Sequence, residues 1–188
     1  SKYINSNTKL QEVVQYKNNS VWGVRSRNKE QLFALNLLMD PNIPIVSLVG
    51  KAGSGKTLLA TAAGLQQVME QDNEPMYKRL IISRPIQPLG NDIGFLPGTM
   101  QEKMAPWLMP IQDNLQFLMG DDKSTLEMYV DKGIIEIEAL TYIRGRSISN
   151  AFIIIDEAQN LTTHEIKTII TRVGEGTKIV FTGDIDQI

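Results

Sequence analysis

The sequence contains no cysteine and a single histidine, His164, among its 188 residues. The absence of cysteine excludes disulfides, thiolate metal sites and cysteine nucleophiles. A lone histidine also argues against a histidine-based metal centre, which needs several imidazole ligands. Because disulfides are typical of oxidising compartments, a chain without cysteine is interpreted as a cytoplasmic protein.

The sequence is also poor in net charge and in long apolar runs. Its formal charge is -2 and its pI is near 5.5, so any contact with nucleic acid must be local. No apolar stretch reaches the ~18 residues of a membrane span, and no basic-then-apolar leader opens the chain. The hydrophobic content of 42% is enough for one well-buried domain. The first residue is Ser1 rather than Met, which we interpret as the start of a fragment.

Segments with apolar residues at helical spacing alternate along the chain with short segments that are apolar throughout. Residues 1–20 are polar and are interpreted as a lead-in or linker to a single domain over residues 21–188. Helices are predicted over 28–40, 57–71 and 163–173, with a further helical segment over 101–119 that Pro106 and Pro110 interrupt. Strands are predicted over 45–49, 79–83, 134–140, 151–155 and 178–182. This alternation predicts an α/β fold with a mainly parallel sheet that helices cover on both faces.

Residues 50–57 read GKAGSGKT, a complete match to G-x-x-x-x-G-K-[ST] between a predicted strand and a predicted helix. In such a P-loop, backbone N–H groups turn toward phosphate oxygens, Lys56 reaches the outer phosphates and Thr57 offers its hydroxyl to Mg²⁺. A glycine-rich turn that binds nothing is the alternative. The sequence therefore predicts an ATP site with Mg²⁺, and its nucleotide-binding residues are Gly50, Ala52, Gly53, Ser54, Gly55, Lys56, Thr57 and Leu58.

Two acids and an amide follow later strands. Asp156 ends the apolar run AFIII and is predicted to hold the magnesium ion, while Glu157 is predicted to polarise the attacking water. Gln187, in GDIDQ at the end of the next strand, is predicted to sense the γ-phosphate. Solvated acids at a strand end and a polar turn are the alternatives. Lys56, Glu157 and Gln187 are thus the predicted catalytic residues.

The order GKAGSGKT, DEAQ, GDIDQ resembles the first RecA-like half of superfamily 1 helicases. Residues 83–115 and 138–188 are similar to the PhoH family of ATPases, and VWGVRSRNKEQ (21–31) resembles the PhoH domain of proteins in which a PIN ribonuclease domain comes first. The resemblance implies a RecA-like P-loop NTPase whose ATPase activity is coupled to RNA unwinding and cleavage. It also implies an upstream PIN domain and a homo-oligomer, often a hexameric ring.

The family pattern assigns Gln31 to the adenine base, and a side-chain amide can pair with adenine N6 and N7. Asn28 and Gln31 also have the spacing of a helix capping box, so Gln31 could instead satisfy a backbone donor. Trp22 is interpreted either as a neighbour of the base or as a core aromatic residue.

Three arginines are cationic candidates for RNA phosphates or for the γ-phosphate of a neighbouring subunit: Arg84, Arg144 and Arg146. Solvated or structural ion pairs are the alternative. A full superfamily 1 helicase supplies such arginines from a second RecA-like half. The chain has no such half, so we expect a neighbouring protomer or a further segment to supply them.

The segment FLPGTMQEKMAPWLMP carries flexible apolar residues: Phe95, Met100, Met104, Trp107 and Met109. It is interpreted as a subunit interface or lid, with burial in the domain's own core as an equal alternative. His164 lies between Thr162 and Glu165, which have capping-box spacing, and is interpreted as structural.

The function that these patterns favour is an RNA-directed motor ATPase. A nucleotide-dependent switch or assembly module is the alternative. A small-molecule kinase would use the same P-loop but needs an acceptor pocket, and the adjacent Asp156 and Glu157 argue against it.

Overall fold

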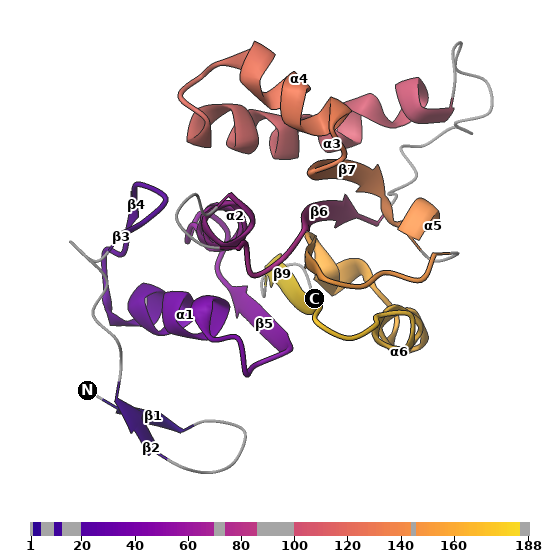
Figure 1. Ribbon diagram of the computed structural model, residues 1–188. Helices are drawn as coiled ribbons and strands as arrows, with labels where there is room; N and C mark the ends of the chain where they lie inside the picture. The colour runs from indigo at the N-terminus through magenta and orange to yellow at the C-terminus, as the bar shows by residue number, and fades with distance from the viewer. Residues whose placement is uncertain are drawn as a thin grey trace.

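The computed structural model describes residues 2–4, 10–12, 20–69, 74–85, 100–143 and 146–184, with a five-stranded parallel sheet at its centre (Figure 1). The strand order is β5-β9-β8-β6-β7, and every described pair within this sheet is parallel. The α/β prediction is therefore confirmed. The strands are β5 (Ile45–Gly50), β6 (Arg79–Arg84), β7 (Ile135–Ala139), β8 (Ala151–Ile155) and β9 (Lys178–Asp184).

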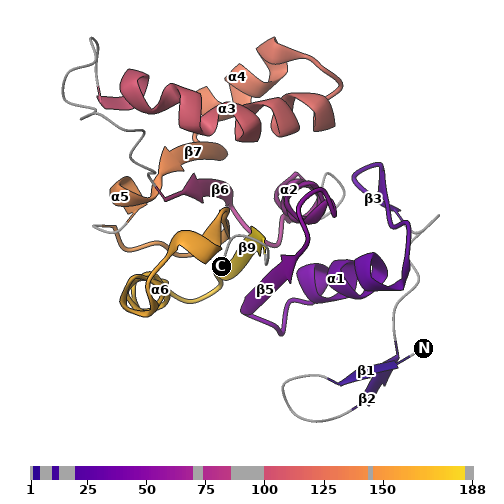
Figure 2. The same ribbon diagram turned by 180° about the vertical axis from the view of Figure 1, so that it is seen from behind.

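Helices lie on both faces of the sheet, and each face has its own hydrophobic core (Figures 1 and 2). Neighbouring residues of β6 separate the two cores, because Ile82 packs with the first and Ile81 with the second. The first core holds residues of α1 (Lys29–Met39), α2 (Lys56–Val68), α3 (Met100–Leu118) and α4 (Lys123–Asp131). The second holds residues of α5 (Leu140–Ile143) and α6 (Thr163–Thr171).

Helix α2 packs unusually close to the sheet, and this places the P-loop. Its residues Ala60, Ala62 and Ala63 are fully buried. A Cβ added at Gly64 would lie 2.7 Å from Leu80 Cδ1 and 3.0 Å from Phe152 Cδ1. A stripe of small residues thus lets the helix approach strands β6 and β8, so its first turn stands at the carboxyl ends of the strands.

One helix prediction is wrong: α3 runs without interruption through Pro106 and Pro110. Both prolines are exposed, so the carbonyl groups that lose an amide partner can bind water instead. The opposite side of α3 carries Leu108, Ile111 and Leu115 into the first core. The stretch around Trp107 is therefore partly core, whereas Met109 keeps 47% of its surface exposed.

Several short elements were not predicted. Helices α4 and α5 were missed, and α2 ends at Val68 rather than near residue 71. The polar lead-in contains two short strands, β1 (Lys2–Ile4) and β2 (Leu10–Glu12), which pair antiparallel. A second hairpin, β3 (Ser20–Val21) with β4 (Val24–Arg25), turns at Trp22 and Gly23. Among the described helices, none is both long and apolar enough to cross a membrane.

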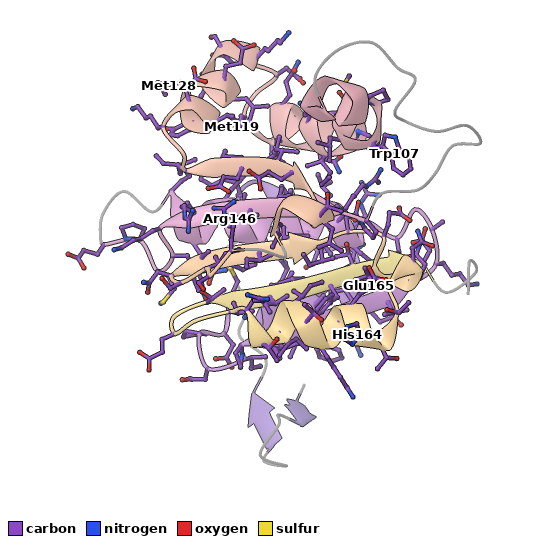
Figure 3. The ribbon with its side chains drawn as sticks, turned by 90° about the vertical axis from the view of Figure 1, so that its right-hand side faces the viewer. Trp107, Met119, Met128, Arg146, His164 and Glu165 are labelled. Atoms are coloured by element: carbon purple, nitrogen blue, oxygen red, sulfur yellow. The ribbon has the colours of Figure 1, made fainter. Side chains whose placement is uncertain are left out.

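The predicted helix starts are confirmed. Asn28 Oδ1 accepts a hydrogen bond from Gln31 N at 2.8 Å and begins α1. Thr162 and Glu165 form the full capping box of α6, with both bonds at 3.1 Å. His164 follows the cap and is exposed, and Figure 3 shows it with Glu165 on this helix.

Lys178 is a buried lysine at the first residue of β9, with only 1% of its surface exposed. Its Nζ donates to the carbonyl oxygens of Leu37 at 2.5 Å and of Asp40 at 2.8 Å, at the end of α1. Burial lowers the pKa of Lys178 to about 8, and the charge of Asp40 offsets only part of this effect. The amine thus connects the end of α1 to β9, the second strand of the sheet.

The substitution Lys178→Met tests whether burial lowers the pKa of Lys178, because such a shift makes the unfolding free energy depend on pH. Between pH 8 and 10.5 the folded chain has lost the Lys178 proton while the unfolded chain keeps it. The unfolding free energy of the wild type should therefore rise with pH relative to the variant, by about 3 kcal/mol over this window. Urea unfolding at a series of pH values measures the difference. The exposed Lys132→Met is the control, and equal pH profiles for Lys178→Met and wild type would contradict the assignment.

Candidate functional site

A cleft of about 310 Å³ lies where the carboxyl ends of β5, β9, β8 and β6 meet. Within neighbouring pairs the register aligns these ends, because Gly50 pairs with Asp184 and Ser83 pairs with Ile155, while β9 continues beyond β8. In open α/β sheets this edge is where ligands bind. The cleft is lined by Gly53, Gly55, Lys56, Thr57, Leu58, Arg84, Asn114, Asp156, Glu157, Gly183 and Asp184.

The P-loop forms one wall of this cleft. Gly53 and Gly55 adopt φ values of +77° and +79°, a left-handed region in which other residues are strained. Gly55 also precedes α2, and no side chain caps the first turn of that helix. The backbone N–H groups of this turn are thus available to an anion, and the positive end of the helix dipole favours one there.

Lys56 crosses the mouth of the P-loop. Its Nζ donates to Asp184 Oδ1 at 2.9 Å, to the carbonyl oxygen of Lys51 at 2.8 Å and to Ser54 Oγ at 3.0 Å. Asp184 lies at the end of β9 and was not predicted as a site residue. Asp184 is the first acid of the GDIDQ motif, which was its only signal in the sequence. Its position opposite Lys56 follows from the pairing of β9 with β5.

Asp156 is buried at the end of β8, with 4% of its surface exposed. Its Oδ1 accepts hydrogen bonds from Thr57 Oγ1 at 3.0 Å and from Thr182 Oγ1 at 2.8 Å. Its Oδ2 accepts from Arg84 Nε at 2.9 Å. The structure therefore brings together Thr57 and Asp156, the two predicted metal ligands, and adds Thr182, which was not predicted.

Hydroxyl and carboxylate oxygens are the ligands that Mg²⁺ prefers, so this pair fits the predicted ion. Among the described residues there is no group of three or more His, Cys, Asp or Glu side chains that could form a protein cage for a metal. Mg²⁺ commonly binds through one or two protein oxygens with waters and phosphate oxygens in the remaining positions. Thr57 and Asp156 are the described residues that would hold it.

Glu157 leaves the strand in a different direction from Asp156, because its backbone has φ 57° and ψ 37°. This left-handed conformation is uncommon for a residue with a side chain. The carboxylate reaches the cleft, where Oε1 is 3.5 Å from Arg84 Nη2 and Oε2 accepts a bond from Gln159 Nε2 at 2.6 Å. The structure thus places both predicted acids at one cleft, as expected.

Arg84 lies between the two acids and helix α3. Besides its bonds to Asp156 and Glu157, its Nη1 donates to the carbonyl oxygen of Trp107 at 3.2 Å. Figure 3 shows Trp107 on α3. Of the roles considered for Arg84, namely contact with RNA phosphates, contact with a neighbouring subunit's γ-phosphate and a structural ion pair, the structure shows the ion pair.

Arg146 lies in a separate ion-pair network on β7. It donates to Glu136 at 2.8 Å and to Glu138 at 3.1 Å, and Arg79 donates to Glu136 at 2.9 Å. Burial opposes ionisation of Glu136, but the hydrogen bonds and charges of Arg146 and Arg79 outweigh it and lower the pKa of this carboxyl. In Figure 3, Arg146 lies over the face of the sheet. Arg146 is therefore engaged by two acids of β7, and Arg144 lies outside the described residues.

Gln31 lies in a second cavity of about 590 Å³ between α1, β5 and the P-loop. Its Oε1 accepts a bond from Arg27 N at 2.6 Å, and its Nε2 donates to the carbonyl oxygen of Ser54 at 3.1 Å. Gln31 therefore does satisfy a backbone donor, but that donor is Arg27 rather than Asn28. The same side chain binds the P-loop directly.

Trp22 lies outside both cavities, since its Nε1 donates to the carbonyl oxygen of Leu118 at 2.9 Å and its ring packs on the first core. The structure favours the core reading for this residue. Gln187, Phe95 and the side chains of Met100 and Met104 lie outside the described residues, so their predicted roles stay predictions.

The profile of the family described as PhoH-like protein matches residues 23–188. The chain belongs to the PhoH-like family. A Protein PhoH2 of Bacillus subtilis (strain 168) is 56% identical over 170 residues, which cover 89% of this chain and 38% of the relative. The Protein PhoH2 of Mycolicibacterium smegmatis is 41% identical over 168 residues, covering 89% and 37%. A PhoH-like protein of Mycobacterium tuberculosis (strain H37Rv) is 42% identical over 144 residues, covering 77% and 39%. This PhoH-like chain thus spans under two fifths of the length of these relatives.

The importance of Arg84 to the PhoH-like site can be tested by Arg84→Ala. The change leaves the buried Asp156 carboxylate without its cation, so we expect a loss of about 1–3 kcal/mol of unfolding free energy. Arg172 is exposed and forms no ion pair with any described residue, and Arg172→Ala should cost under ~0.5 kcal/mol. Chemical denaturation of both variants measures the difference. Equal stability of the two variants would show that Arg84 is not needed to hold the acids.

Proposed function

We propose that this chain binds ATP with Mg²⁺ in the cleft and hydrolyses it, and that hydrolysis drives the unwinding or remodelling of RNA. One observation carries the hydrolytic part. Thr57 Oγ1 and Asp156 Oδ1 are 3.0 Å apart beside the P-loop, and Glu157 faces the same cleft. Two ligands for one metal ion, next to a carboxylate that can orient water, are the arrangement of an NTP hydrolase.

Each described residue has a distinct task in this proposal. Lys56 exchanges its bond to Asp184 for the outer phosphates, and the N–H groups around Gly53 and Gly55 bind the phosphate oxygens. Thr57 and Asp156 would hold Mg²⁺, which would offset negative charge on the phosphates. Glu157 orients the attacking water and accepts its proton. Gln187 remains the proposed γ-phosphate sensor.

Gln31 remains the proposed contact to adenine. Its amide oxygen and amide nitrogen each have one described partner. An amide oxygen can accept two hydrogen bonds and an amide nitrogen can donate two. The side chain therefore keeps one acceptor position and one donor position, which match the N6 donor and the N7 acceptor of adenine.

Coupling to RNA, an upstream PIN ribonuclease domain and assembly into a homo-oligomer, including a hexameric ring, are proposed from the family resemblance. Arg84 and Arg146, the described candidates for a catalytic arginine, already pair with acids of this chain. An arginine from a neighbouring subunit could supply positive charge at the γ-phosphate that these two described arginines do not offer. This need supports the proposed oligomer.

A nucleotide-dependent switch or assembly module is the second candidate, and the contacts of Arg84 favour it. The guanidinium touches both acids and a carbonyl of α3. A change at the acids can therefore reach α3 directly. Such a switch would hydrolyse ATP slowly and without dependence on RNA.

Glu157→Gln tests the hydrolytic role. The amide can occupy the same space but cannot accept a proton, so we expect ATP hydrolysis to fall by at least about 100-fold. The affinity for ATP should stay within about threefold, because Glu157 is not a phosphate or metal ligand in the proposal. Phosphate release and equilibrium binding of ATP measure the two quantities. A variant with wild-type turnover would exclude Glu157 as the base.

The RNA coupling is tested by ATP hydrolysis of the purified protein with and without single-stranded RNA, together with its mass in solution. A motor should hydrolyse ATP several-fold faster with RNA, since strand binding and turnover share one cycle. Equal rates would reject the motor and leave the switch. Transfer of phosphate to a metabolite instead of water would reject both in favour of a kinase.

A further inference from the structure

Gln159 touches two parts of the site at once. It belongs to the short 3-10 helix η3 (Ala158–Asn160), which follows Glu157 directly. Its Nε2 donates to Glu157 Oε2 at 2.6 Å, and its Oε1 accepts from the backbone N–H of Asp184 at 3.2 Å. One amide side chain therefore connects the carboxyl end of β8 with the carboxyl end of β9.

Gly183 leaves the space that this contact needs. A Cβ at this position would lie 2.7 Å from Gln159 Oε1 and 3.2 Å from Gln159 N. Gly183 is absent from the described glycines with positive φ, so its backbone does not require a glycine. The glycine is needed because η3 packs directly on β9.

Glu157 has few other restraints. Its side chain is 28% exposed, and its second carboxylate contact, to Arg84 Nη2, is long at 3.5 Å. A glutamate has several rotatable bonds, and a proton acceptor that is displaced by about 1 Å can lose 100-fold in rate. The 2.6 Å bond from Gln159 is the shorter contact and sets the direction of the carboxylate.

We propose that Gln159 is a positioning residue for Glu157 in the proposed ATP hydrolysis, on which this inference rests. Its amide nitrogen holds the Glu157 carboxylate, and its amide oxygen fixes that position relative to Asp184. Since Asp184 Oδ1 also binds Lys56 at 2.9 Å, the orientation of the base is connected to the residue that meets the phosphates. Gln159 thereby couples occupation of the P-loop to the geometry of hydrolysis.

Two substitutions separate the two halves of the amide. Gln159→Met keeps the length and loses the hydrogen bonds to Glu157 and to Asp184 N. Gln159→Glu keeps an acceptor for Asp184 N but loses the donor and places a second negative charge beside Glu157. Gln112→Met, on α3 and outside the residues that line the cleft, is the matched control.

Steady-state ATP hydrolysis by the purified variants is the test. For Gln159→Met we expect kcat to fall at least tenfold while KM for ATP stays within about threefold, because the residue acts on the base and not on the nucleotide. For Gln159→Glu we expect a larger fall in kcat than for Gln159→Met. Gln112→Met should match the wild type, and thermal unfolding verifies that all variants are folded.

Three results would overturn the proposal. An unchanged kcat for Gln159→Met shows that the base needs no help from this amide. A higher kcat for Gln159→Glu than for Gln159→Met shows that the residue only anchors Asp184. A rise in KM with unchanged kcat shows a role in binding. Failure of the wild type to hydrolyse ATP would instead reject the proposed function itself, so the two failures are distinguishable.

Discussion

The site depends on a single buried charge, the carboxylate of Asp156. A buried carboxylate is costly unless partners satisfy it, and here the partners come from three other elements. Thr57 belongs to α2, Thr182 to β9 and Arg84 to β6. Satisfying this one charge therefore fixes the P-loop helix and the two strands that flank β8 relative to one another.

Two kinds of cation, a guanidinium and a metal ion, would compete for the same carboxylate. Arg84 binds Asp156 Oδ2 and approaches Glu157, whereas Thr57 binds Asp156 Oδ1, so a metal ion held by Thr57 and Asp156 would share this carboxylate with a guanidinium. Arg84 also binds a carbonyl of α3, a helix with two internal prolines. Because each proline lacks the N–H group of a helical hydrogen bond, the helix is easier to bend near the prolines. A shift of the guanidinium would therefore act on α3 at Trp107, which lies between the two prolines.

The sequence was sufficient for those features that depend on local pattern. The strands 151–155 and 178–182 have continuous apolar runs, and GKAGSGKT is specific in itself, so the sheet and the positions of Thr57, Asp156 and Glu157 could be predicted. Asp184, Thr182 and Gln159 could not, because their roles follow from strand register and not from residue type. The unbroken α3 was missed since proline predicts a break unless the helix exposes the affected side. Arg84 was found as a cation, but its partners depend on side-chain packing.

One amide side chain, that of Gln159, connects the acids beside Arg84 with the Lys56–Asp184 ion pair. Two cations, Lys56 and Arg84, pair with three carboxylates, Asp184, Asp156 and Glu157, so a further carboxylate at a connecting position would repel its neighbours. A glutamine both donates and accepts without changing that balance. Gln31 uses these two functions to join Arg27, just before α1, to the P-loop, and Gln159 uses them to join Glu157 to β9. Neutral bridges of this kind can fix distances in the cleft while its net charge remains free to change when phosphate and metal bind.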